Sequence, residues 1–389
     1  MSLSLVTFAD LGRRTNKKTG EALSVIEKFL MEKELCQVIC RINKDFYFPG
    51  TQPAVSLPVH YFLRGTEEYL FRSFPARKIE EDLFDRRARG LIKKADAVLF
   101  YPARFPRTLE KAKEEGSITI GVGAEASPRY VAELDREESK RLGLRPRNIE
   151  EKRLSSDVTD KADYILALSD FVKDSYVRYG FPAEKIFTAS LDIDKDKFSP
   201  SPDAKKDKFR VIFVSDISIL KGLHYLLEAW ETLRLKNSEL VILGQYKKAD
   251  LDPELEKRYE DRIKKDPSIK FLGHVSNPEE YINNSSVLVF PSLAEGFGKV
   301  TLEAMGCGAP VVTTENAKGV VEDGKNGFVV PTRDPKALAE KIKFLADNPK
   351  EAARMGEAAR QSFLTKPDFG SQVFDIYKKI LLKENKLAI

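Results

Sequence analysis

Short runs of apolar residues alternate with segments of helical periodicity along most of the chain. Uninterrupted apolar runs of this kind are typical of strands buried in a parallel sheet, and the amphipathic segments between them are typical of helices. In the first half of the chain the apolar runs are 3–10, 35–42, 95–101, 118–123 and 162–169. This alternation predicts parallel sheets covered by helices.

The pattern breaks at 196–210, where Pro200 and Pro202 stand among serines, lysines and aspartates, a composition typical of a linker. A second series of apolar runs follows at 210–216, 240–245, 269–275, 287–292, 310–315 and 327–331. We therefore expect an α/β protein with two Rossmann-like, doubly wound domains, one over residues 1–200 and one over 208–368. Residues 369–389 have the spacing of a terminal amphipathic helix.

Length and composition agree with this division. A chain of 389 residues with 42% apolar residues is too long for one ordinary core. The net charge is only +5 and no nucleic-acid-binding motif occurs, so a nucleic-acid partner is not expected. Residues 1–10 have a strand pattern without the features of a signal peptide, and no apolar run is long enough for a membrane helix. These features predict a cytoplasmic protein.

The three cysteines, Cys36, Cys40 and Cys307, form an odd and sparse set. Such a set argues against a disulfide framework and favours a reducing compartment. Cys36 and Cys40 have no further cysteine or histidine near them in sequence to complete a zinc site. We interpret both as core residues.

The most informative stretch is 292–312, where Gly296 and Gly298 flank Phe297 and a helical composition begins at Lys299. Glycines allow a ligand to approach the backbone closely. The amides that we expect to point outward at the positive end of the helix dipole are those of Lys299, Val300, Thr301 and Leu302. Such a helix end binds anions, and a diphosphate fits it.

Two carboxylates bracket this helix start, Glu295 in the loop and Glu303 in the first helical turns. Ionised carboxylates accept hydrogen bonds from hydroxyl groups. We expect one of them to hold a sugar and the other to hold a ribose, on either side of the diphosphate.

These two glutamates, the Gly-Phe-Gly between them and the following Glu-Ala-Met-Gly-x-Gly-x-Pro-Val-Val resemble the Glu-x7-Glu signature of the retaining glycosyltransferases of family 4. The resemblance covers most of residues 155–365. It implies the GT-B fold, in which two Rossmann-like domains face a central cleft. The first domain would bind the acceptor, the second would bind a nucleoside diphosphate sugar, and the last helix would cross back onto the first domain.

The resemblance also implies roles for individual residues. Lys221, after a strand and a turn, would neutralise the leaving diphosphate, and Glu295, the second catalytic residue, would orient the sugar. Relatives usually carry an arginine five positions before that lysine, where this chain has Asp216. They also place a histidine in the first domain, and here Ser127 or Glu125 occupies that neighbourhood. Helix amides and Lys221 can offset the developing charge, so neither a metal nor another cofactor is expected.

Two further positions are candidate donor contacts. His274 ends a strand whose loop would border the nucleotide base, and Gly20 opens the first helix, where a phosphate or the acceptor could approach. Gly12 is the rival of Gly20. The other histidines, His60 and His224, are interpreted as structural.

Two more segments have alternative interpretations. The run Asp192, Asp194, Asp196 suggests a metal site, but Lys197 stands where a calcium loop needs glycine, so a hinge is favoured. Residues 61–94 combine aromatic and basic side chains that could contact anionic lipid at a membrane surface. Acidic residues interleave with them, which favours a solvated helix with internal ion pairs.

The sequence therefore predicts a retaining, metal-independent glycosyltransferase that moves a sugar from a nucleoside diphosphate to a saccharide, lipid-linked or small-molecule acceptor. Asp216 and the absent histidine motivate an alternative, a GT-B protein that binds nucleotide sugars without transferring them. A third alternative is a GT-B epimerase of donor sugars.

Overall fold

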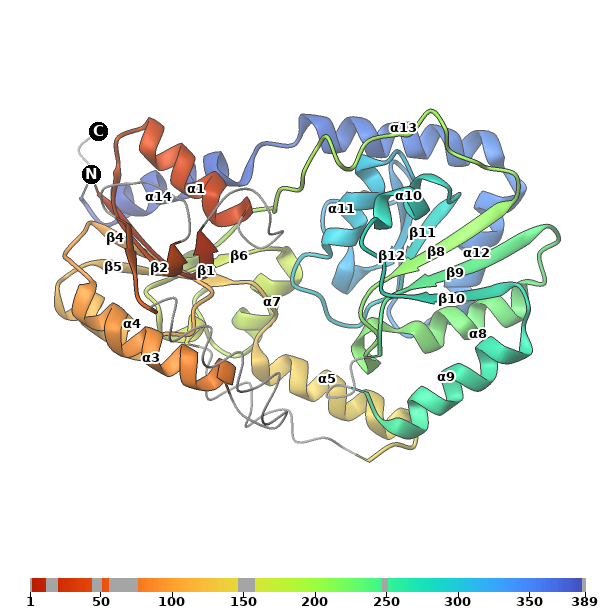
Figure 1. Ribbon diagram of the computed structural model, residues 1–389, viewed down its shortest axis with the longest axis horizontal. Helices are drawn as coiled ribbons and strands as arrows, with labels where there is room; N and C mark the ends of the chain where they lie inside the picture. The colour runs from red at the N-terminus through yellow and green to blue at the C-terminus, as the bar shows by residue number, and fades with distance from the viewer. Residues whose placement is uncertain are drawn as a thin grey trace. The chain divides into compact units, whose positions relative to one another are not determined.

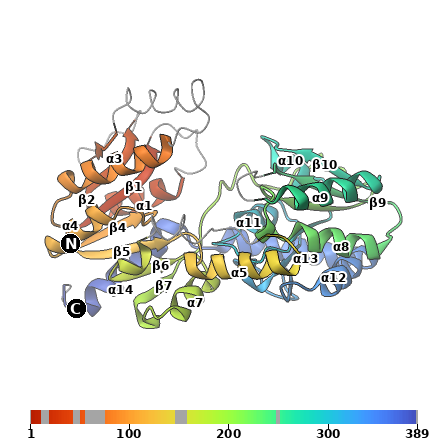
Figure 2. The same ribbon diagram turned by 90° about the horizontal axis from the view of Figure 1, so that it is seen from below.

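Two separate parallel sheets form the framework of the protein. The computed structural model describes residues 2–11, 20–43, 51–55, 76–145, 158–246 and 251–386. The N-terminal domain comprises Met1–Pro128, Glu151–Asp192 and Pro367–Ile389, and the C-terminal domain comprises Arg129–Glu150 and Ile193–Lys366. Figures 1 and 2 show the elements of both.

The N-terminal domain contains a seven-stranded parallel sheet in the order β3-β2-β1-β4-β5-β6-β7. The five apolar runs predicted in this half of the chain all form strands. The structure adds two short strands, β3 and β7, whose three residues are too few to show a pattern. The strands are β1 Leu3–Leu11, β2 Leu35–Asn43, β3 Thr51–Pro53, β4 Ala97–Tyr101, β5 Ile118–Gly123, β6 Tyr164–Ala167 and β7 Ile186–Thr188.

Helices cover both faces of this sheet (Figure 1). On one face α1 and α14 pack side by side, with the Phe29 ring 5.1 Å from Phe374 and 5.2 Å from Tyr377. On the other face α3 packs against α4. The helices are α1 Gly20–Met31, α3 Ala76–Leu91, α4 Pro106–Glu114, α7 Asp170–Arg178 and α14 Phe369–Lys383, with 3-10 turns at Thr159–Lys161 and Ala183–Lys185.

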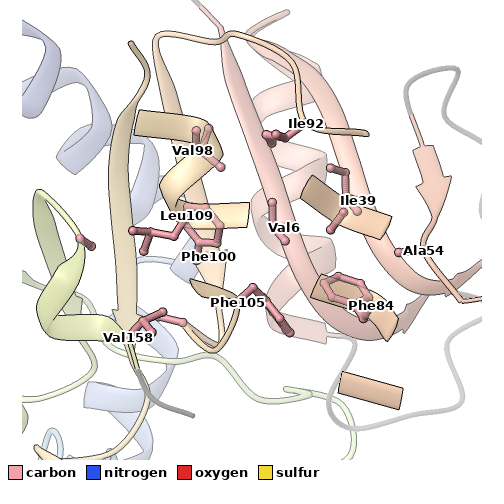
Figure 3. Packing of buried hydrophobic residues seen from close by; sticks show 14 of the residues in the cluster. Val6, Ile39, Ala54, Phe84, Ile92, Val98, Phe100, Phe105, Leu109 and Val158 are labelled. Atoms are coloured by element: carbon pink, nitrogen blue, oxygen red, sulfur yellow. The ribbon is translucent and has the colours of Figure 1, made fainter. Parts of the chain in front are cut away.

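The core between the sheet and the α3–α4 pair is built from aliphatic and aromatic side chains (Figure 3). Val6 and Phe100 project from the central strands, and Phe84 of α3 meets Phe105 with ring centroids 4.5 Å apart. All four side chains have no exposed surface. This burial fixes α3 and α4 on the sheet, because removing apolar area of this size from water is strongly favourable.

The C-terminal domain contains a six-stranded parallel sheet in the order β10-β9-β8-β11-β12-β13. Each strand lies within one of the predicted apolar runs or overlaps it closely. The strands are β8 Phe209–Val214, β9 Ser238–Leu243, β10 Ile269–Gly273, β11 Val287–Phe290, β12 Val311–Thr314 and β13 Gly327–Val330.

Helices again cover the two faces of the sheet. Helix α8 packs beside α12, as Figure 2 shows, and α11 packs beside α13. Leu226, Leu227 and Trp230 of α8 are buried, as their spacing predicted. The helices are α5 Pro128–Arg141, α8 Leu223–Leu233, α9 Pro253–Lys265, α10 Pro278–Asn283, α11 Lys299–Gly306, α12 Pro335–Asp347 and α13 Pro349–Thr365, with 3-10 turns at Ile219–Lys221 and Glu315–Ala317.

The domain boundaries differ from those expected at 200 and 368. The chain passes between domains at Asp192 and at Lys366, and residues 129–150 belong to the C-terminal domain. The linker residues belong there too, because Asn283 of α10 donates to the Ser199 carbonyl and accepts the Ser201 amide. Helices α1 and α14, far apart in sequence, belong to the N-terminal domain.

One expectation for the cysteines is wrong. Cys40 and Cys307 are buried, but Cys36 is exposed. The short strand β3 pairs with β2 only from Val38 onward, so β2 has no neighbour from β3 beside Cys36. Among the helices of the described residues, none has the length and apolar character that crossing a bilayer requires.

Candidate functional site

The C-terminal sheet changes direction between β8 and β11. From β8 the chain adds β9 and then β10 on one side, and it then adds β11, β12 and β13 on the other. Loops at the carboxyl ends of two such adjacent strands diverge and leave a crevice, where ligands of open α/β sheets bind. The residues after β8 and after β11 are therefore the first candidates for a site.

The loops after these two strands pack closely together. The turn Ile219–Lys221 leads into Gly222, which has a φ of 70° and is the N-cap of α8. A Cβ added to Gly222 would lie 2.0 Å from the Pro291 carbonyl oxygen, so this position requires glycine. The Leu293 amide donates to the Leu220 carbonyl at 2.7 Å. These contacts hold Lys221 beside the loop that carries Glu295.

Lys221 and Glu295 form an ion pair with each other. Both side chains are mostly buried, and the Lys221 ammonium also lies 5.7 Å from the centre of the Phe290 ring. The resemblance implied that these two residues are the catalytic pair, and the structure brings them together. An ammonium has three donors, so Lys221 can bond Glu295 and still donate to another oxygen.

Hydrogen bonds from Ser292 and Asn316 restrain the loop that carries Glu295. The Ser292 hydroxyl lies 3.0 Å from the carbonyl oxygens of Leu220 and Ala294. From the loop after β12, the Asn316 side-chain amide donates to the Leu293 carbonyl at 2.7 Å. Hydrogen bonds to the segments after β8 and β12, the two neighbours of β11, thus restrain the backbone of the loop that carries Glu295.

Helix α11 begins at Lys299 as predicted, with Gly298 as its N-cap in the left-handed region at a φ of 76°. A helix with this cap directs the amides of residues 298 to 301 away from its own hydrogen-bond ladder. The Thr301 amide and hydroxyl both bond the Gly298 carbonyl at 2.8 Å. The Thr301 amide is therefore bonded within the first turn, contrary to the expectation, and the amides placed at the positive end are those of Gly298, Lys299 and Val300. The role of the Leu302 amide stays a prediction.

Most residues between Glu295 and Glu303 are buried. Phe297, Val300, Thr301 and Leu302 are each at most 8% exposed, so they can serve a ligand only through the backbone. Gly296 is buried as well, whereas Glu303 on α11 is partly exposed. The helix N-terminus and the partly exposed side chains of Glu295, Lys299 and Glu303 are thus the accessible polar groups of this stretch.

The remaining residues discussed for the donor site follow strands of the two sheets. Asp216 is partly exposed in the loop after β8. His274 is exposed and follows β10, two strands away from β8. Gly20 begins α1 in the N-terminal domain, and its rival Gly12 lies outside the described residues.

The aspartates at the domain boundary bond backbone amides. Asp192 accepts the Phe369 amide, and the Asp194 carboxylate accepts the amides of Asp196 and Lys197 at 3.0 Å. The chain leaves the N-terminal domain directly after Asp192. In the part of the chain that the structure describes, no three acidic, histidine or cysteine side chains gather into a metal-binding group.

Residues discussed for the N-terminal domain have mixed outcomes. Ser127 is buried and its amide donates to the Ser175 hydroxyl at 2.8 Å, whereas Glu125 is exposed. On α3, Asp82 pairs with Arg86 and with Arg107, both at 2.8 Å. The Arg107 hydrogen bond lowers the Asp82 pKa. Residues 61–75 and His60 lie outside the described residues.

A buried polar cluster in the C-terminal domain escaped the sequence reasoning. Glu138 of α5, with no exposed surface, accepts hydrogen bonds from His224 at 3.0 Å, Tyr225 at 2.6 Å and Arg333 at 2.8 Å. The second ring nitrogen of His224 bonds the Tyr259 hydroxyl at 3.0 Å. His224 is therefore structural, as predicted.

The charge of Glu138 is preserved by these partners. Burial opposes it, but the hydrogen bonds from His224, Tyr225 and Arg333 outweigh burial and hold the Glu138 pKa at about 2. One sequence signal existed, because Val131 and Glu138 are seven residues apart and so share the apolar face of α5. The partners themselves could not be identified from that spacing.

Comparison with known proteins connects this geometry to a family. Residues 194–362 match the family described as Glycosyl transferases group 1. Over 227 residues the chain is 28% identical to the capsular polysaccharide biosynthesis glycosyltransferase CapM of Staphylococcus aureus, which covers 54% of this chain and 58% of that protein. Over 220 residues it is 30% identical to the D-inositol 3-phosphate glycosyltransferase of Paenarthrobacter aurescens, covering 52% and 53%. The chain thus matches little more than half the length of these curated relatives.

Solved structures resemble the whole chain. HepE from Anabaena in complex with UDP superposes with a TM-score of 0.66 at 16% identity, covering 98% of this chain and 99% of that one. Sucrose-phosphate synthase from Thermosynechococcus elongatus gives 0.67 at 17% identity, with the same coverage. Identity this low establishes the fold alone. The fold is GT-B, as the sequence predicted.

Proposed function

We propose that this protein is a retaining glycosyltransferase that moves a sugar from a nucleoside diphosphate sugar to a saccharide, lipid-linked or small-molecule acceptor. The observation that carries the proposal is the meeting of Lys221, Glu295 and the N-terminus of α11 at the switch point of the C-terminal sheet. A cation and a helix N-terminus attract a diphosphate, and carboxylates accept hydrogen bonds from sugar hydroxyls.

The comparisons support a nucleotide sugar as donor. The matched family and the relatives named above are glycosyltransferases. HepE has been crystallised with UDP and with UDP-glucose. On this proposal the C-terminal domain binds the donor and the N-terminal domain binds the acceptor. Gly20, at the start of α1, lets a phosphate or the acceptor approach that helix end.

Each site residue has one role in the proposed reaction. The diphosphate lies against the amides of Gly298, Lys299 and Val300 and receives the Lys221 ammonium. Glu295 accepts hydrogen bonds from hydroxyls of the transferred sugar, and Glu303 accepts them from the ribose. His274, which follows β10, borders the base.

The proposed chemistry needs no nucleophile from the protein. The bond between the anomeric carbon and the diphosphate oxygen breaks, and the acceptor oxygen bonds that carbon from the same face. The acceptor's proton passes to the departing diphosphate. Lys221 and the α11 amides stabilise the charge that develops on that diphosphate, and this preorganised stabilisation is the largest contribution expected from the protein. Transfer is therefore independent of divalent metal, and EDTA should leave the rate unchanged.

The proposal is tested by incubating the purified protein with UDP-, GDP- and ADP-sugars and an acceptor library while diphosphate release is measured. One nucleotide should support release, and Lys221→Ala should slow it about 100-fold or more. Lys350→Ala removes an exposed lysine at the start of α13 and should leave the rate unchanged. Release that does not depend on Lys221 would contradict the assignment.

A second candidate function is binding of a nucleotide sugar without transfer. It is favoured by Asp216, a carboxylate where the resemblance expects an arginine. This protein would bind one nucleoside diphosphate tightly and release none from its sugar with any acceptor. An epimerase would interconvert donor sugars without an acceptor, which the same incubations detect.

Cytoplasmic location and contact with anionic lipid remain part of the proposal. The described portion of 61–94 carries ion pairs on α3, including that of Asp82 with Arg86. Sedimentation with phosphatidylglycerol vesicles measures lipid contact directly. Binding that disappears in 0.5 M salt, on the order of the concentration that shortens electrostatic screening to a few ångströms, would support it.

A further inference from the structure

The charge around the start of α11 is poorly matched to a diphosphate. Lys221 already shares its charge with Glu295, and Asp216 adds a negative charge after β8. Glu303 adds another on the helix itself. Lys299, the first residue of α11, is partly exposed and adds one positive charge, which is fewer than the carboxylates around it. A diphosphate brings several further negative charges, so the site formed by these groups is short of positive charge. This inference rests on the proposed function and concerns the same site.

The loop after β12 contacts the other side of the α11 start. A Cβ added to Gly298 would lie 3.1 Å from the Ala317 carbonyl oxygen. A Cβ added to Gly319 would lie 2.8 Å from the Phe297 carbonyl oxygen and 3.4 Å from the Thr301 hydroxyl. The residues on both sides of Lys318 are thus packed against the turn that begins α11.

The backbone of this loop is held in place. The Thr313 hydroxyl lies 3.3 Å from the Ala317 carbonyl, and the Val321 amide donates to the Lys318 carbonyl at 2.8 Å. Asn316 joins the same loop to Leu293 at 2.7 Å. Lys318 therefore has a fixed position from which only its side chain moves.

The charge of Lys318 is available for a ligand. Its side chain is exposed and forms no ion pair with the described residues of the chain. Nearby lysines differ, since Lys221 pairs with Glu295 and Lys325 pairs with Glu322 at 2.9 Å. The stem of a lysine is long and flexible enough to bring its ammonium to an anion beside its own backbone.

The order of the strands places Lys221 and Lys318 on opposite sides of the start of α11. In the sheet, β11 lies between β8 and β12. Lys221 follows β8, α11 follows β11, and Lys318 follows β12. The two lysines thus flank the helix N-terminus from opposite sides.

We propose that Lys318 is a second diphosphate-binding cation of the donor site and supplies the positive charge that is missing at Asp216. Lys221 and Lys318 bind the diphosphate from its two sides, with the amides of Gly298 to Val300 between them. The ligand class is the diphosphate of a nucleoside diphosphate sugar. A nucleoside monophosphate, with less negative charge, depends on Lys318 less.

The test is equilibrium titration of UDP, GDP and ADP, and of the monophosphate of whichever base binds, at several salt concentrations. Lys318→Ala should weaken binding of the diphosphate about five- to tenfold, as expected for an exposed cation facing a multiply charged anion. Binding of the monophosphate should change less than about twofold, because solvent screens the attraction between an exposed lysine and an anion of lower charge. The salt dependence of diphosphate binding should be shallower than in the wild type.

Two matched variants serve as controls. Lys318→Arg keeps the charge and should retain most of the affinity. Lys350→Ala removes an exposed lysine from α13, a helix whose Gly356 packs on Gly308 beyond the C-terminal end of α11, and should bind as the wild type does. The melting temperature of Lys318→Ala should equal that of the wild type, because the side chain is exposed.

The outcomes separate two failures. If Lys221→Ala weakens diphosphate binding and Lys318→Ala leaves affinity and salt dependence unchanged, Lys318 has no such role and the proposed function stands. If the folded wild type binds none of the three diphosphates, the proposed function fails and this inference fails with it.

Discussion

At the scale of single residues, the proposed sugar transfer depends on the ion pair between Lys221 and Glu295. Lys221 and Glu295 come from loops after two adjacent strands, and each is the partner of the other. A carboxylate beside the ammonium holds the lysine in position, but it also reduces the attraction that an incoming diphosphate experiences. On the proposed function, the pair would therefore balance binding of the phosphates against orientation of the sugar.

Replacing Glu295 with glutamine should separate these two effects. Glu295→Gln keeps the shape of the side chain and leaves the Lys221 charge uncompensated, so affinity for the nucleoside diphosphate should rise a few-fold. Sugar transfer should fall about 100-fold, because the hydroxyls of the sugar lose a charged acceptor. Titration of the diphosphate and initial rates of transfer measure the two quantities. Equal losses in both would show that Glu295 only holds the lysine.

We propose that Glu303 contacts a different part of the same ligand, the ribose. If it accepts hydrogen bonds from the ribose, Glu303→Ala should weaken binding of the nucleoside diphosphate about tenfold, the cost of a hydrogen bond to a charged group. Glu322→Ala, which removes an exposed glutamate paired with Lys325, is the control. An unchanged affinity in Glu303→Ala would remove Glu303 from this role.

At the scale of elements, the apolar runs predicted the strands because central strands such as β5, β6, β11 and β12 are buried on both faces and so have an uninterrupted apolar pattern. The start of α11 was predictable from Gly298 and the residues after it. The bonding of its first turn was not, because the left-handed cap that directs the Thr301 amide to Gly298 depends on local torsions. Strands β3 and β7 were missed because they have only three residues each.

The start of α4 is capped by Asp85 of α3, a contact that could not be predicted from the sequence. Helix α4 begins at Pro106, and Asp85 of α3 accepts the amides of Arg107 at 3.1 Å and Thr108 at 3.0 Å. Asp85 also accepts the Thr108 hydroxyl at 2.8 Å and is buried. Asp85 therefore caps the N-terminus of α4 although it lies in another helix, α3.

Asp85→Ala should lower the free energy of unfolding by about 1–3 kcal/mol, because buried donors at the start of α4 lose their acceptor. Asp82→Ala removes a carboxylate three residues away whose ion pairs with Arg86 and Arg107 lie at the surface. It should cost less than about 1 kcal/mol. Urea unfolding followed by circular dichroism measures both, and equal effects would show that Asp85 is not a cap.

At the scale of the whole molecule, the sequence predicted two domains but misplaced one segment between them. Residues 129–150 follow β5 directly in the chain, and α5 nevertheless belongs to the C-terminal domain. Its Glu138 bonds His224, Tyr225 and Arg333, which lie from 86 to 195 residues further along the chain. Contacts over such separations leave no periodic signal in a sequence, so this part of the fold required the structure.

The Glu138 cluster predicts how the stability of the C-terminal domain depends on pH. The Glu138 pKa is lowered from 4.5 to about 2 in the folded protein, so its contribution is complete above 4.5 and is lost as the pH falls toward 2. Glu138→Gln should therefore destabilise the domain strongly at pH 7, by about 3–5 kcal/mol, because Arg333 loses its buried partner. The difference from the wild type should narrow at pH 3.

The single tryptophan makes this measurable, since Trp230 is buried in α8 and reports on the C-terminal domain. Denaturant unfolding followed by its fluorescence at pH 7 and pH 3 gives the comparison. Glu137→Gln, an exposed neighbour that also bonds Arg333, is the control and should change little at either pH. A Glu138→Gln deficit that is the same at both pH values would contradict the assigned charge.

The central claim is that the start of α11 is the diphosphate site of a nucleotide-sugar donor. The most direct measurement is a crystal structure of the protein soaked with UDP-, GDP- and ADP-sugars. The account predicts a diphosphate within hydrogen-bonding distance of the amides of Gly298 to Val300, with Lys221 donating to it. A nucleotide sugar bound at another place, with the α11 start covered by the protein's own side chains, would contradict it.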